Sequence, residues 1–367
     1  MKKNLFLSLR FVSLLLVILA AFSCSHQHDH HDTLDEKPIN IILMIGDGMG
    51  FAQVHAATLS SGEPLTMLNA QYTGSITTHS YDNLITDSGA GGTALATGKK
   101  TNNGMIGMTP DSVAVPSMLD IFAENGKSTG IVVSCGVTHA TPASFIAKNV
   151  KRSNYEAIAL DFLNSPVDVV IGGGIRHFNQ RKDGRMLTAE MEEKGFTYLN
   201  KLPENASAFN KLLVLTDSVH PVSVLEGRGN LLPEGTKLAL QSLSKSKNGF
   251  FLMVEGSQID WAGHGNDSAF LVNEMFDFDK AVTEAFKFAD TNPGTLVIVT
   301  ADHETGGLTL IHGENKNSIK FAFSSSDHSG IMVPVYAYGT GAKQFVGSYD
   351  NTDLFDRIMK VAGIQLK

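Results

Sequence analysis

Three short apolar segments of the chain each run directly into acidic or histidine residues. Such continuous apolar runs predict strands that are buried on both faces of a parallel sheet. The segments, each with its polar continuation, are 40–45 with Asp47; 249–254 with Glu255, Asp260 and His264; and 295–300 with Asp302 and His303. Because parallel strands bring their carboxyl ends to one edge of a sheet, we expect these side chains to form one site.

The rest of the pattern predicts an α/β fold, with a mostly parallel central sheet flanked by helices on both faces. The chain has 367 residues, of which 43% are hydrophobic, so it can bury a large core. Further strands are expected at 73–80, 129–134, 167–171, 212–215 and 333–338, and helices at 115–125, 188–194, 237–244, 273–290 and 352–362. Since neither an internal repeat nor an interdomain linker follows residue 38, residues 39–367 are expected to form one domain.

Residues 1–23 are predicted to be a secretory signal peptide. A positively charged start precedes an apolar run at 11–21, and the small residue Ser23 stands before Cys24. The apolar run is short for a membrane span. Cys24 after a small residue resembles a bacterial lipoprotein box, in which this cysteine is lipidated; plain secretion is the alternative. We therefore expect an exported protein, either periplasmic or anchored to the outer membrane by lipid.

The stretch 24–38 is predicted to be a polar, histidine-rich tether. Its histidines could gather metal for a site further along the chain, or the stretch could be only a solvated linker. The one other cysteine, Cys135, follows an apolar run and is expected to be a small buried hydrophobe. If Cys24 carries lipid, an intramolecular disulfide is excluded.

The net charge of −8 and the lack of a basic run argue against nucleic acid as a partner. A net-negative protein that handles an anion needs local positive charge, which bound metal ions can supply.

A run of small residues at 87–98 predicts a short helix with a reactive start. Asp87 and Ser88 stand where the N-cap and first turn would fall, and Gly98 stands where a helix would stop. Backbone N–H groups and the positive helix end beside Ser88 favour an alkoxide and an incoming anion. The small side chains would leave room for a substrate. The alternative is an N-capped, tightly packed structural helix.

The candidate ligands suit two kinds of metal ion. Carboxylates and imidazoles without cysteine suit a catalytic Zn²⁺ site. Hard oxygens from Glu255, Asp47 and Thr141 suit Mg²⁺, and Thr141 before Pro142 also predicts a helix N-cap. Two cations a few ångströms apart clamp the oxygens of an in-line phosphoryl displacement, beside which Ser88 would be an activated nucleophile.

An ordered set of motifs resembles the alkaline phosphatase family. The matching segments are 45–50, 86–90, 139–142, 254–264, 300–304 and 328–335. Each motif is weak alone, but together they span residues 40–363 in the order of the family. The sequence of residues 256–261 is most similar to that of the compact bacterial members.

The resemblance implies a phosphomonoesterase that forms a phosphoserine at Ser88 and releases inorganic phosphate and an alcohol. It also implies two Zn²⁺ ions, one Mg²⁺ ion and a homodimer. Only residues 304–327 separate His303 from His328, too few for the large interfacial insertion of some members. The catalytic domain would therefore be 39–367 without that insertion.

The resemblance also assigns ligands. The ligands of the first zinc would be Asp260, His264 and His328. The ligands of the second zinc would be Asp47, Asp302 and His303. The third ion would be held by Thr141, Glu255 and the shared Asp47. Arg152 would hold two phosphate oxygens as a planar fork.

Two positions depart from the family pattern. His139 replaces an aspartate near the third ion, where it could bind the ion and favour Zn²⁺ or Co²⁺, or could orient a water. Trp261, a candidate substrate-binding residue, replaces a lysine or histidine. The site would therefore lack one positively charged contact to phosphate.

Two other readings stay open. Sister families that share the two-metal frame act as phosphodiesterases or sulfatases, but they usually have other residues in place of Ser88, Thr141 and Glu255. A non-enzymatic lipoprotein that binds phosphate or zinc would account for the tether, but not for Ser88 at a helix start.

Overall fold

The computed structural model describes residues 39–315 and 318–365. The expected signal peptide, the lipidation site Cys24 and the tether to residue 38 lie outside the described residues. Among the helices within these ranges, none combines the length and the apolar character needed to cross a bilayer.

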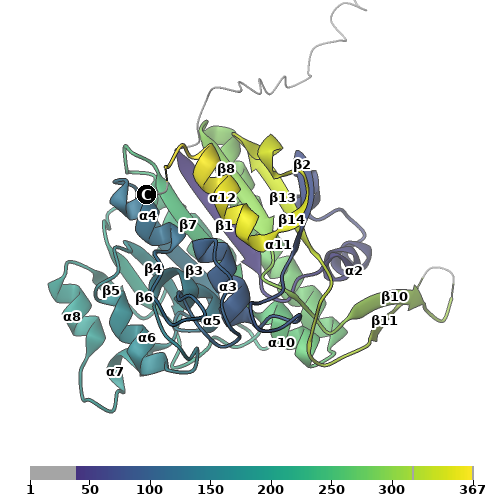
Figure 1. Ribbon diagram of the computed structural model, residues 1–367, viewed down its shortest axis with the longest axis horizontal. Coiled ribbons are helices and arrows are strands. Elements are labelled where there is room, and N and C mark those ends of the chain that lie inside the picture. Colours follow the sequence, from purple (N-terminus) through teal and green to yellow (C-terminus); the bar gives the residue numbers. More distant parts are fainter. Residues whose placement is uncertain (1–38, 316–317, 366–367) are drawn as a thin grey trace, which may run out of the picture. The chain divides into compact units, whose positions relative to one another are not determined.

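Within the described residues, one ten-stranded sheet forms the centre of the fold (Figure 1). The strands in spatial order are β14 (Gly347–Asp350), β2 (Tyr72–Thr77), β13 (Val333–Gly339), β8 (Thr295–Thr300), β1 (Asn40–Gly46), β7 (Phe250–Gly256), β3 (Ser128–Gly136), β4 (Val169–Gly173), β6 (Leu212–Leu215) and β5 (Thr197–Leu199). Of these ten, only β13 runs against its neighbours, β2 and β8. The predicted mostly parallel sheet is confirmed.

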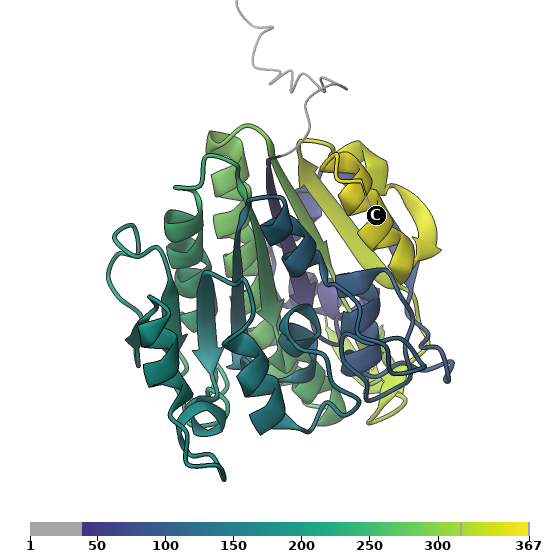
Figure 2. The same ribbon diagram turned by 60° about the vertical axis from the view of Figure 1, so that its left-hand side comes forward.

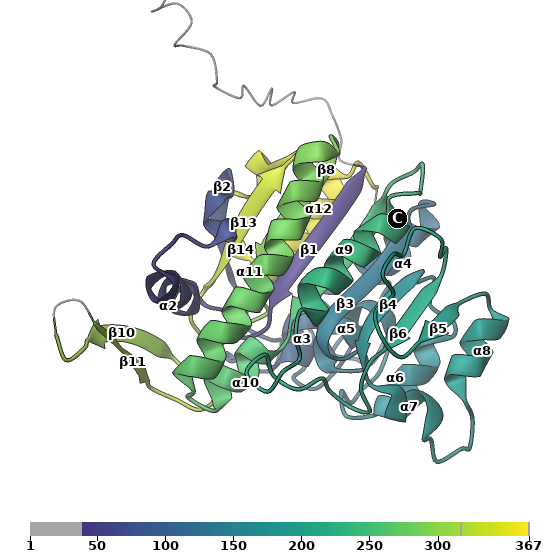
Figure 3. The same ribbon diagram turned by 180° about the vertical axis from the view of Figure 1, so that it is seen from behind.

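Helices cover both faces of this sheet. Figure 1 shows α3, α4 and α12 in front of it, Figure 3 shows α9 and α11 on the opposite face, and Figure 2 shows the sheet between the two layers. The helices are α2 (Phe51–Ser61), α3 (Ser88–Thr97), α4 (Met118–Glu124), α5 (Ala140–Ile146), α6 (Tyr155–Phe162), α7 (Ile175–Asn179), α8 (Leu187–Glu193), α9 (Leu231–Leu243), α10 (Gln258–His264), α11 (Ser268–Thr291) and α12 (Asn351–Val361), with the 3₁₀ turns η1 (Thr66–Asn69) and η2 (Ala342–Phe345).

Two small antiparallel pairs complete the fold. β10 (Leu308–His312) and β11 (Ile319–Phe323) form a hairpin that extends away from the sheet in Figures 1 and 3. β9 (Glu304–Thr305) pairs with β12 (His328–Ser329). This second pairing carries His328 back to the end of β8, so the short segment between His303 and His328 is enough to complete the site.

The three strands that end in candidate ligands are neighbours, in the order β8, β1, β7. Ile45 of β1 lies level with Glu255 of β7 and with Thr300 of β8. The Asp47 N–H donates to Gly256 O at 3.2 Å, just past the paired residues. This register brings the polar continuations of all three strands to one edge, as the sequence predicted.

Helix α3 begins and ends where its residues predict. The Asp87 carboxylate accepts from Ala90 N at 2.9 Å, and Gly98 adopts the left-handed conformation at φ 66°. All ten residues of α3 are buried. A Cβ on Gly91 would lie 2.8 Å from Asp302 O, so this glycine lets the helix pack directly on the end of β8. Space for a substrate was therefore the wrong explanation for the small residues of the helix; they allow close packing.

The predicted N-cap at Thr141 is wrong, because α5 begins at Ala140 with His139 as the N-cap. Ala143 N donates to His139 O at 2.9 Å, which starts the helix earlier. Pro142 then falls in the first turn, where a missing N–H costs little. The Thr141 hydroxyl is left free to point at the site.

Candidate metal centre

Three groups of possible metal ligands lie at this edge of the sheet. In the part of the chain that the structure describes, they are Asp47, Asp302 and His303; Asp260, His264 and His328; and Cys135, His139 and Glu255. In each group, one ligand atom per residue lies within 4.8 Å of the others. The side chains of each predicted zinc set therefore lie close together, whereas the third group contains a cysteine that was not expected there.

The Asp47 group is completely buried around one imidazole nitrogen. His303 Nε2 lies 3.3 Å from Asp47 Oδ1 and 3.4 Å from Asp302 Oδ2. Ser88 Oγ lies 3.2 Å from the same nitrogen. Two carboxylates, an imidazole and the predicted nucleophile thus converge on one point.

The proton of His303 can be placed from its other nitrogen. Thr305 Oγ1 donates to Asp260 Oδ1, so it can accept from His303 Nδ1, which lies 3.2 Å away. Burial and, to a smaller extent, the charge of His328 hold the pKa of His303 well below its usual range, so the ring is neutral. Its Nε2 lone pair therefore faces the two carboxylates, an arrangement that needs a cation between them.

The Asp260 group has two imidazoles facing each other. His264 and His328 approach through their Nε2 atoms at 3.2 Å, and each Nε2 lies 3.4 Å from Asp260 Oδ1. Their Nδ1 atoms are held by backbone carbonyls, Ser326 O at 2.7 Å and Thr86 O at 2.8 Å. Since a proton on each Nδ1 serves those carbonyls, both Nε2 lone pairs are free to bind one ion.

Without a cation, Asp260 and His328 compensate for each other. Burial lowers the pKa of His328, but the hydrogen bond and charge of Asp260 outweigh burial and raise it to about 9. Burial would raise the pKa of Asp260, but His328, His303 and His264 hold it below its usual range. His328 then carries a proton, which a bound cation would displace.

The third group surrounds Glu255 at the end of β7. Thr141 Oγ1 donates to Asp47 Oδ2 at 3.4 Å and to Asp302 Oδ2 at 3.5 Å. Burial, and to a smaller extent the charge of Asp302, raises the pKa of Glu255 to about 8, although a hydrogen bond from Thr141 acts in the opposite direction. Thr141 therefore joins the third group to the Asp47 group, as the family pattern implied.

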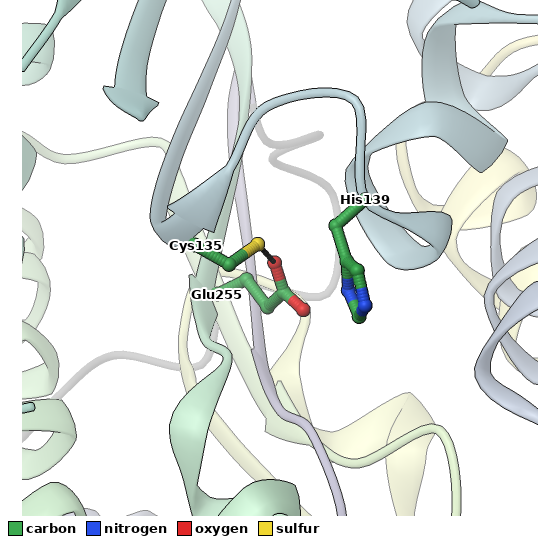
Figure 4. Close-up of side chains that lie close together, drawn as sticks. All are labelled: Cys135, His139 and Glu255. Atoms are coloured by element: carbon green, nitrogen blue, oxygen red, sulfur yellow. Dashed lines mark hydrogen bonds between the residues drawn. The ribbon is translucent and has the colours of Figure 1, made fainter. Parts of the chain in front are cut away.

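Cys135 is fully buried, as predicted, but it does more than fill space. Its Sγ lies 3.6 Å from Glu255 Oε2 (Figure 4). It also lies 3.3 Å from Gly136 O. Burial, with the negative charge of Glu255, raises the pKa of the thiol well above its usual range. Without a cation the thiol is thus a neutral hydrogen-bond donor at the third group. Position alone, after an apolar strand, does not reveal this role.

The buried charges of the site fit metal ions. Among the described residues, Asp47 Oδ1, His139 Nδ1 and Glu255 Oε1 are buried without a hydrogen-bond partner. Burial has the largest effect on the pKa of Asp47 and, together with the negative charges of Asp302 and Asp260, raises it well above its usual range. Burial and, to a smaller extent, the negative charge of Asp260 raise the pKa of Asp302 to about 7. Unpaired buried carboxylates are costly, and cations at these positions would remove that cost.

Arg152 lies beside the N-terminus of α3. Its Nη1 donates to Asp87 Oδ2 at 2.8 Å, and Asp87 itself caps the helix that starts at Ser88. Burial lowers the pKa of Arg152, but Asp87 outweighs burial and raises it. This contact holds a positive charge beside the start of the helix that carries Ser88.

Trp261 packs against two histidines. Its ring meets His139 edge-on at 6.0 Å between centroids and His220 at 4.9 Å. Burial has the largest effect on the pKa of His139 and, together with the positive charges of Arg152 and His220, lowers it to about 3. This imidazole is therefore neutral. The predicted closeness of Trp261 to the third group is thus present. His220, whose Nδ1 accepts from Gly136 N at 3.0 Å, was missed because no motif surrounds it.

Comparison with known proteins identifies the family. The family profile for alkaline phosphatase matches residues 38–321, most of the chain. The chain belongs to the alkaline phosphatase family. This membership makes it a metal-dependent phosphomonoesterase, as the sequence predicted.

Its relatives include bacterial alkaline phosphatases. Alkaline phosphatase 4 of Bacillus subtilis (strain 168) is 34% identical over 88% of each chain. The alkaline phosphatase of the Antarctic bacterium TAB5 is 39% identical, with a TM-score of 0.88 over 90% of this chain and 99% of its own. A histidine-to-aspartate variant of the TAB5 enzyme has been solved with magnesium bound in its M3 site, at the same identity, TM-score and coverage.

Proposed function

We propose that this chain hydrolyses phosphate monoesters in two steps through a phosphoserine at Ser88. The observation that carries the proposal is the position of Ser88 Oγ, 3.2 Å from His303 Nε2 at the start of α3. The hydroxyl faces one group of metal ligands, and Arg152 contacts Asp87, the residue that precedes Ser88 and caps its helix. A serine that served only to start a helix would not need metal ligands and an arginine nearby.

We further propose how the metal ions are held. The Asp260 group, completed by His264 and His328, would bind one Zn²⁺, and the Asp47 group a second. Thr141, Glu255 and the shared Asp47 would bind a third ion, either Mg²⁺ or, with His139 as a ligand, Zn²⁺ or Co²⁺. The unpartnered buried oxygens and the free Nε2 lone pairs support this assignment.

In the first step, the side chains position the ester and the serine. Arg152, held by Asp87, binds the phosphate oxygens and the N–H groups at the start of α3 face the incoming anion. When bound, the cations would lower the pKa of the Ser88 hydroxyl and neutralise charge on the transferring phosphoryl group. Ser88 Oγ then attacks phosphorus and releases its proton to solvent. The bond from phosphorus to the alcohol oxygen breaks, and the alcohol leaves after taking up a proton from water.

The second step returns the free enzyme. A water attacks the phosphorus of phosphoserine 88, and the bond from phosphorus to Oγ breaks. Inorganic phosphate leaves, and the Ser88 hydroxyl regains a proton. Trp261, which is apolar where a lysine would be charged, gives the departing phosphate one fewer charged hydrogen bond.

The Ser88→Ala variant tests the nucleophile. We expect hydrolysis of p-nitrophenyl phosphate to fall by roughly a thousandfold or more, because the group that forms the covalent intermediate is removed. Transfer of phosphate to Tris should disappear with it. Thermal unfolding and metal content serve as controls and should be unchanged. Near wild-type turnover with the same transfer to Tris would contradict the role of Ser88.

Substrate comparison separates the remaining readings. We expect p-nitrophenyl phosphate to be hydrolysed much faster than bis-p-nitrophenyl phosphate or p-nitrophenyl sulfate. Preference for the diester or the sulfate would favour the sister families instead. Binding of zinc and phosphate without hydrolysis of any of the three would favour a sequestering protein.

Export, a lipid on Cys24 and a homodimer belong to the same proposal. They are supported by the sequence pattern at 1–24 and by the resemblance to bacterial family members. Mass spectrometry of the mature N-terminus would identify the lipid, and analytical ultracentrifugation would give the oligomeric state.

A further inference from the structure

We propose that the ion bound at Glu255 is a thiophilic cation such as Zn²⁺ or Co²⁺, held in part by the sulfur of Cys135 and by His139. This inference rests on the proposed function, because it specifies the third of its metal sites. It differs from an all-oxygen site for Mg²⁺, which would use Thr141 and Asp47 with Glu255 and would leave Cys135 out.

The first support is the placement of the three side chains. Cys135 lies at the end of β3, His139 lies three residues beyond that strand, and Glu255 ends the neighbouring strand β7. Figure 4 shows the thiol, the carboxylate and the imidazole side by side. One ligand atom from each lies within 4.8 Å of the others, and Cys135 Sγ lies 3.6 Å from Glu255 Oε2. Ligands on one Zn²⁺ lie roughly 3.5 Å apart, given bond lengths of about 2.0–2.3 Å.

The second support is the unused bonding capacity of the partners. Glu255 is fully buried, and among the described residues its Oε1 has no hydrogen-bond partner. The same holds for His139 Nδ1, which is shielded from solvent. A cysteine that served only to donate to a carboxylate would explain neither atom. A cation between the three side chains would satisfy both.

The ligand types decide which cation fits. A set of thiolate, imidazole and carboxylate suits Zn²⁺ and Co²⁺, whereas Mg²⁺ favours an octahedron of oxygens. When the metal–sulfur bond forms, the S–H bond breaks and the thiol proton passes to solvent. No electron transfer is involved, so the step needs no oxidant.

Cobalt spectroscopy on the full-length protein tests this directly. Loaded with Co²⁺ at all its sites, the wild type should show the near-ultraviolet charge-transfer band of a sulfur–cobalt bond. Cys135→Ser should lose that band, while Cys24→Ser, which removes the only other cysteine, should keep it. Serine preserves a donor toward Glu255, so the fold should survive; thermal unfolding of metal-loaded protein checks this.

Metal competition gives a second readout. Dialysed against equal concentrations of Zn²⁺ and Mg²⁺, the wild type should hold zinc in place of magnesium at the third site. Cys135→Ser should exchange about one zinc for one magnesium per chain, while Cys24→Ser matches the wild type. An absent sulfur band in fully cobalt-loaded wild type, or the same band and metal content in Cys135→Ser, would overturn the inference.

The two proposals fail in different ways. Ser88-dependent hydrolysis in a protein without a sulfur–cobalt band would overturn only the role of Cys135. A sulfur–cobalt band in a protein that hydrolyses none of the three p-nitrophenyl esters would overturn the proposed function and leave the thiolate ligand in place.

Discussion

At the scale of single residues, hydrogen bonds decide which nitrogen of each histidine faces the metal positions. Ser326 O and Thr86 O hold the Nδ1 atoms of His264 and His328, and Thr305 faces that of His303. Each Nε2 is thereby turned toward the carboxylates. Partners of this kind set the tautomer and orientation of a metal-binding imidazole before the ion arrives.

Thr305 offers a test of this orientation. Thr305→Val removes the acceptor for His303 Nδ1 and the donor to Asp260 while keeping the shape of the side chain. We expect metal affinity to fall by roughly 10–100-fold, as when such partners are lost elsewhere. Competition with a chelator measures the affinity. Thr305→Ser keeps the hydroxyl and should retain most of it; equal loss in both variants would point to packing instead.

Trp261 packs against His139 and His220 beside the third group. Trp261→Lys would add a charged donor near the phosphate. A hydrogen bond to a charged group contributes roughly 1.5–3 kcal/mol, and about 1.4 kcal/mol corresponds to a tenfold change in affinity. We expect inhibition by inorganic phosphate to tighten about tenfold. Trp261→Phe is the control, because it keeps an aromatic ring against His139 and His220 without the charge. If the lysine variant loses stability while its inhibition constant stays unchanged, Trp261 acts only by packing.

At the scale of elements, helix α3 links the nucleophile to the sheet. Its start carries Ser88, and its middle lies against the loop that follows β8. A Cβ on Gly91 would lie 2.8 Å from Asp302 O, and one on Gly92 would lie 3.1 Å from Ser144 Oγ of α5. Close packing without side chains therefore sets the distance between Ser88 and the ligands on β8.

Gly91→Ala tests this packing. The added methyl group would meet backbone, which cannot move aside as a flexible side chain can, so we expect a loss of about 1–3 kcal/mol in unfolding free energy. Activity should fall further than stability alone explains, because Asp302 is displaced. Gly265→Ala is the control: its Cβ would make only ordinary contacts, 3.4 Å or more away, on helical backbone. Equal effects of the two substitutions would argue against a special role for the contact at Gly91.

At the scale of the whole molecule, the fold collects buried negative charge in one place. Asp47, Glu255 and Asp302 come from three adjacent strands and are all fully buried. Burial raises the pKa of each carboxyl group, to about 8 for Glu255 and about 7 for Asp302. The folded protein therefore depends on cations or protons at this edge of the sheet.

Metal removal should make stability depend on pH. From about pH 7 to pH 9, Glu255 and His328 in the folded metal-free protein hold protons that the unfolded chain has largely released, and Asp302 loses its proton at the start of this window. A folded state that binds more protons loses stability as pH rises. We expect a loss of roughly 3 kcal/mol across this window, since each extra proton contributes about 1.4 kcal/mol per pH unit.

Urea unfolding of chelated protein at several pH values measures this dependence. The pKa values of His139, at about 3, and His303 lie below the window, so these groups do not offset the loss. Protein reloaded with Zn²⁺ and Mg²⁺ is the control and should be more stable, with a flatter profile. Identical profiles with and without chelator would contradict metal binding at the carboxylates.

Local features of the sequence determined much of this protein. The strands at 212–215 and 295–300 have the predicted bounds, because apolar runs flanked by polar residues are visible without any tertiary contact. The cap at Asp87 and the stop at Gly98 follow from the same local chemistry. The ordered motifs also identified the family, and the residues that they assign to each predicted zinc group lie close together in the structure.

Tertiary structure alone decided how the third group is composed and how the histidines are oriented. Cys135 and Glu255 are 120 residues apart in the chain, and Thr305 and Asp260 are 45 apart. Strand order and register bring such residues together, and neither is encoded in a local window of sequence. An isolated cysteine after an apolar run therefore predicts only burial. Its proposed ligand role is supported by its position 3.6 Å from Oε2 of Glu255, a carboxylate whose other oxygen has no hydrogen-bond partner among the described residues. The fold converts single residues into a site because parallel pairing makes distant strand ends neighbours.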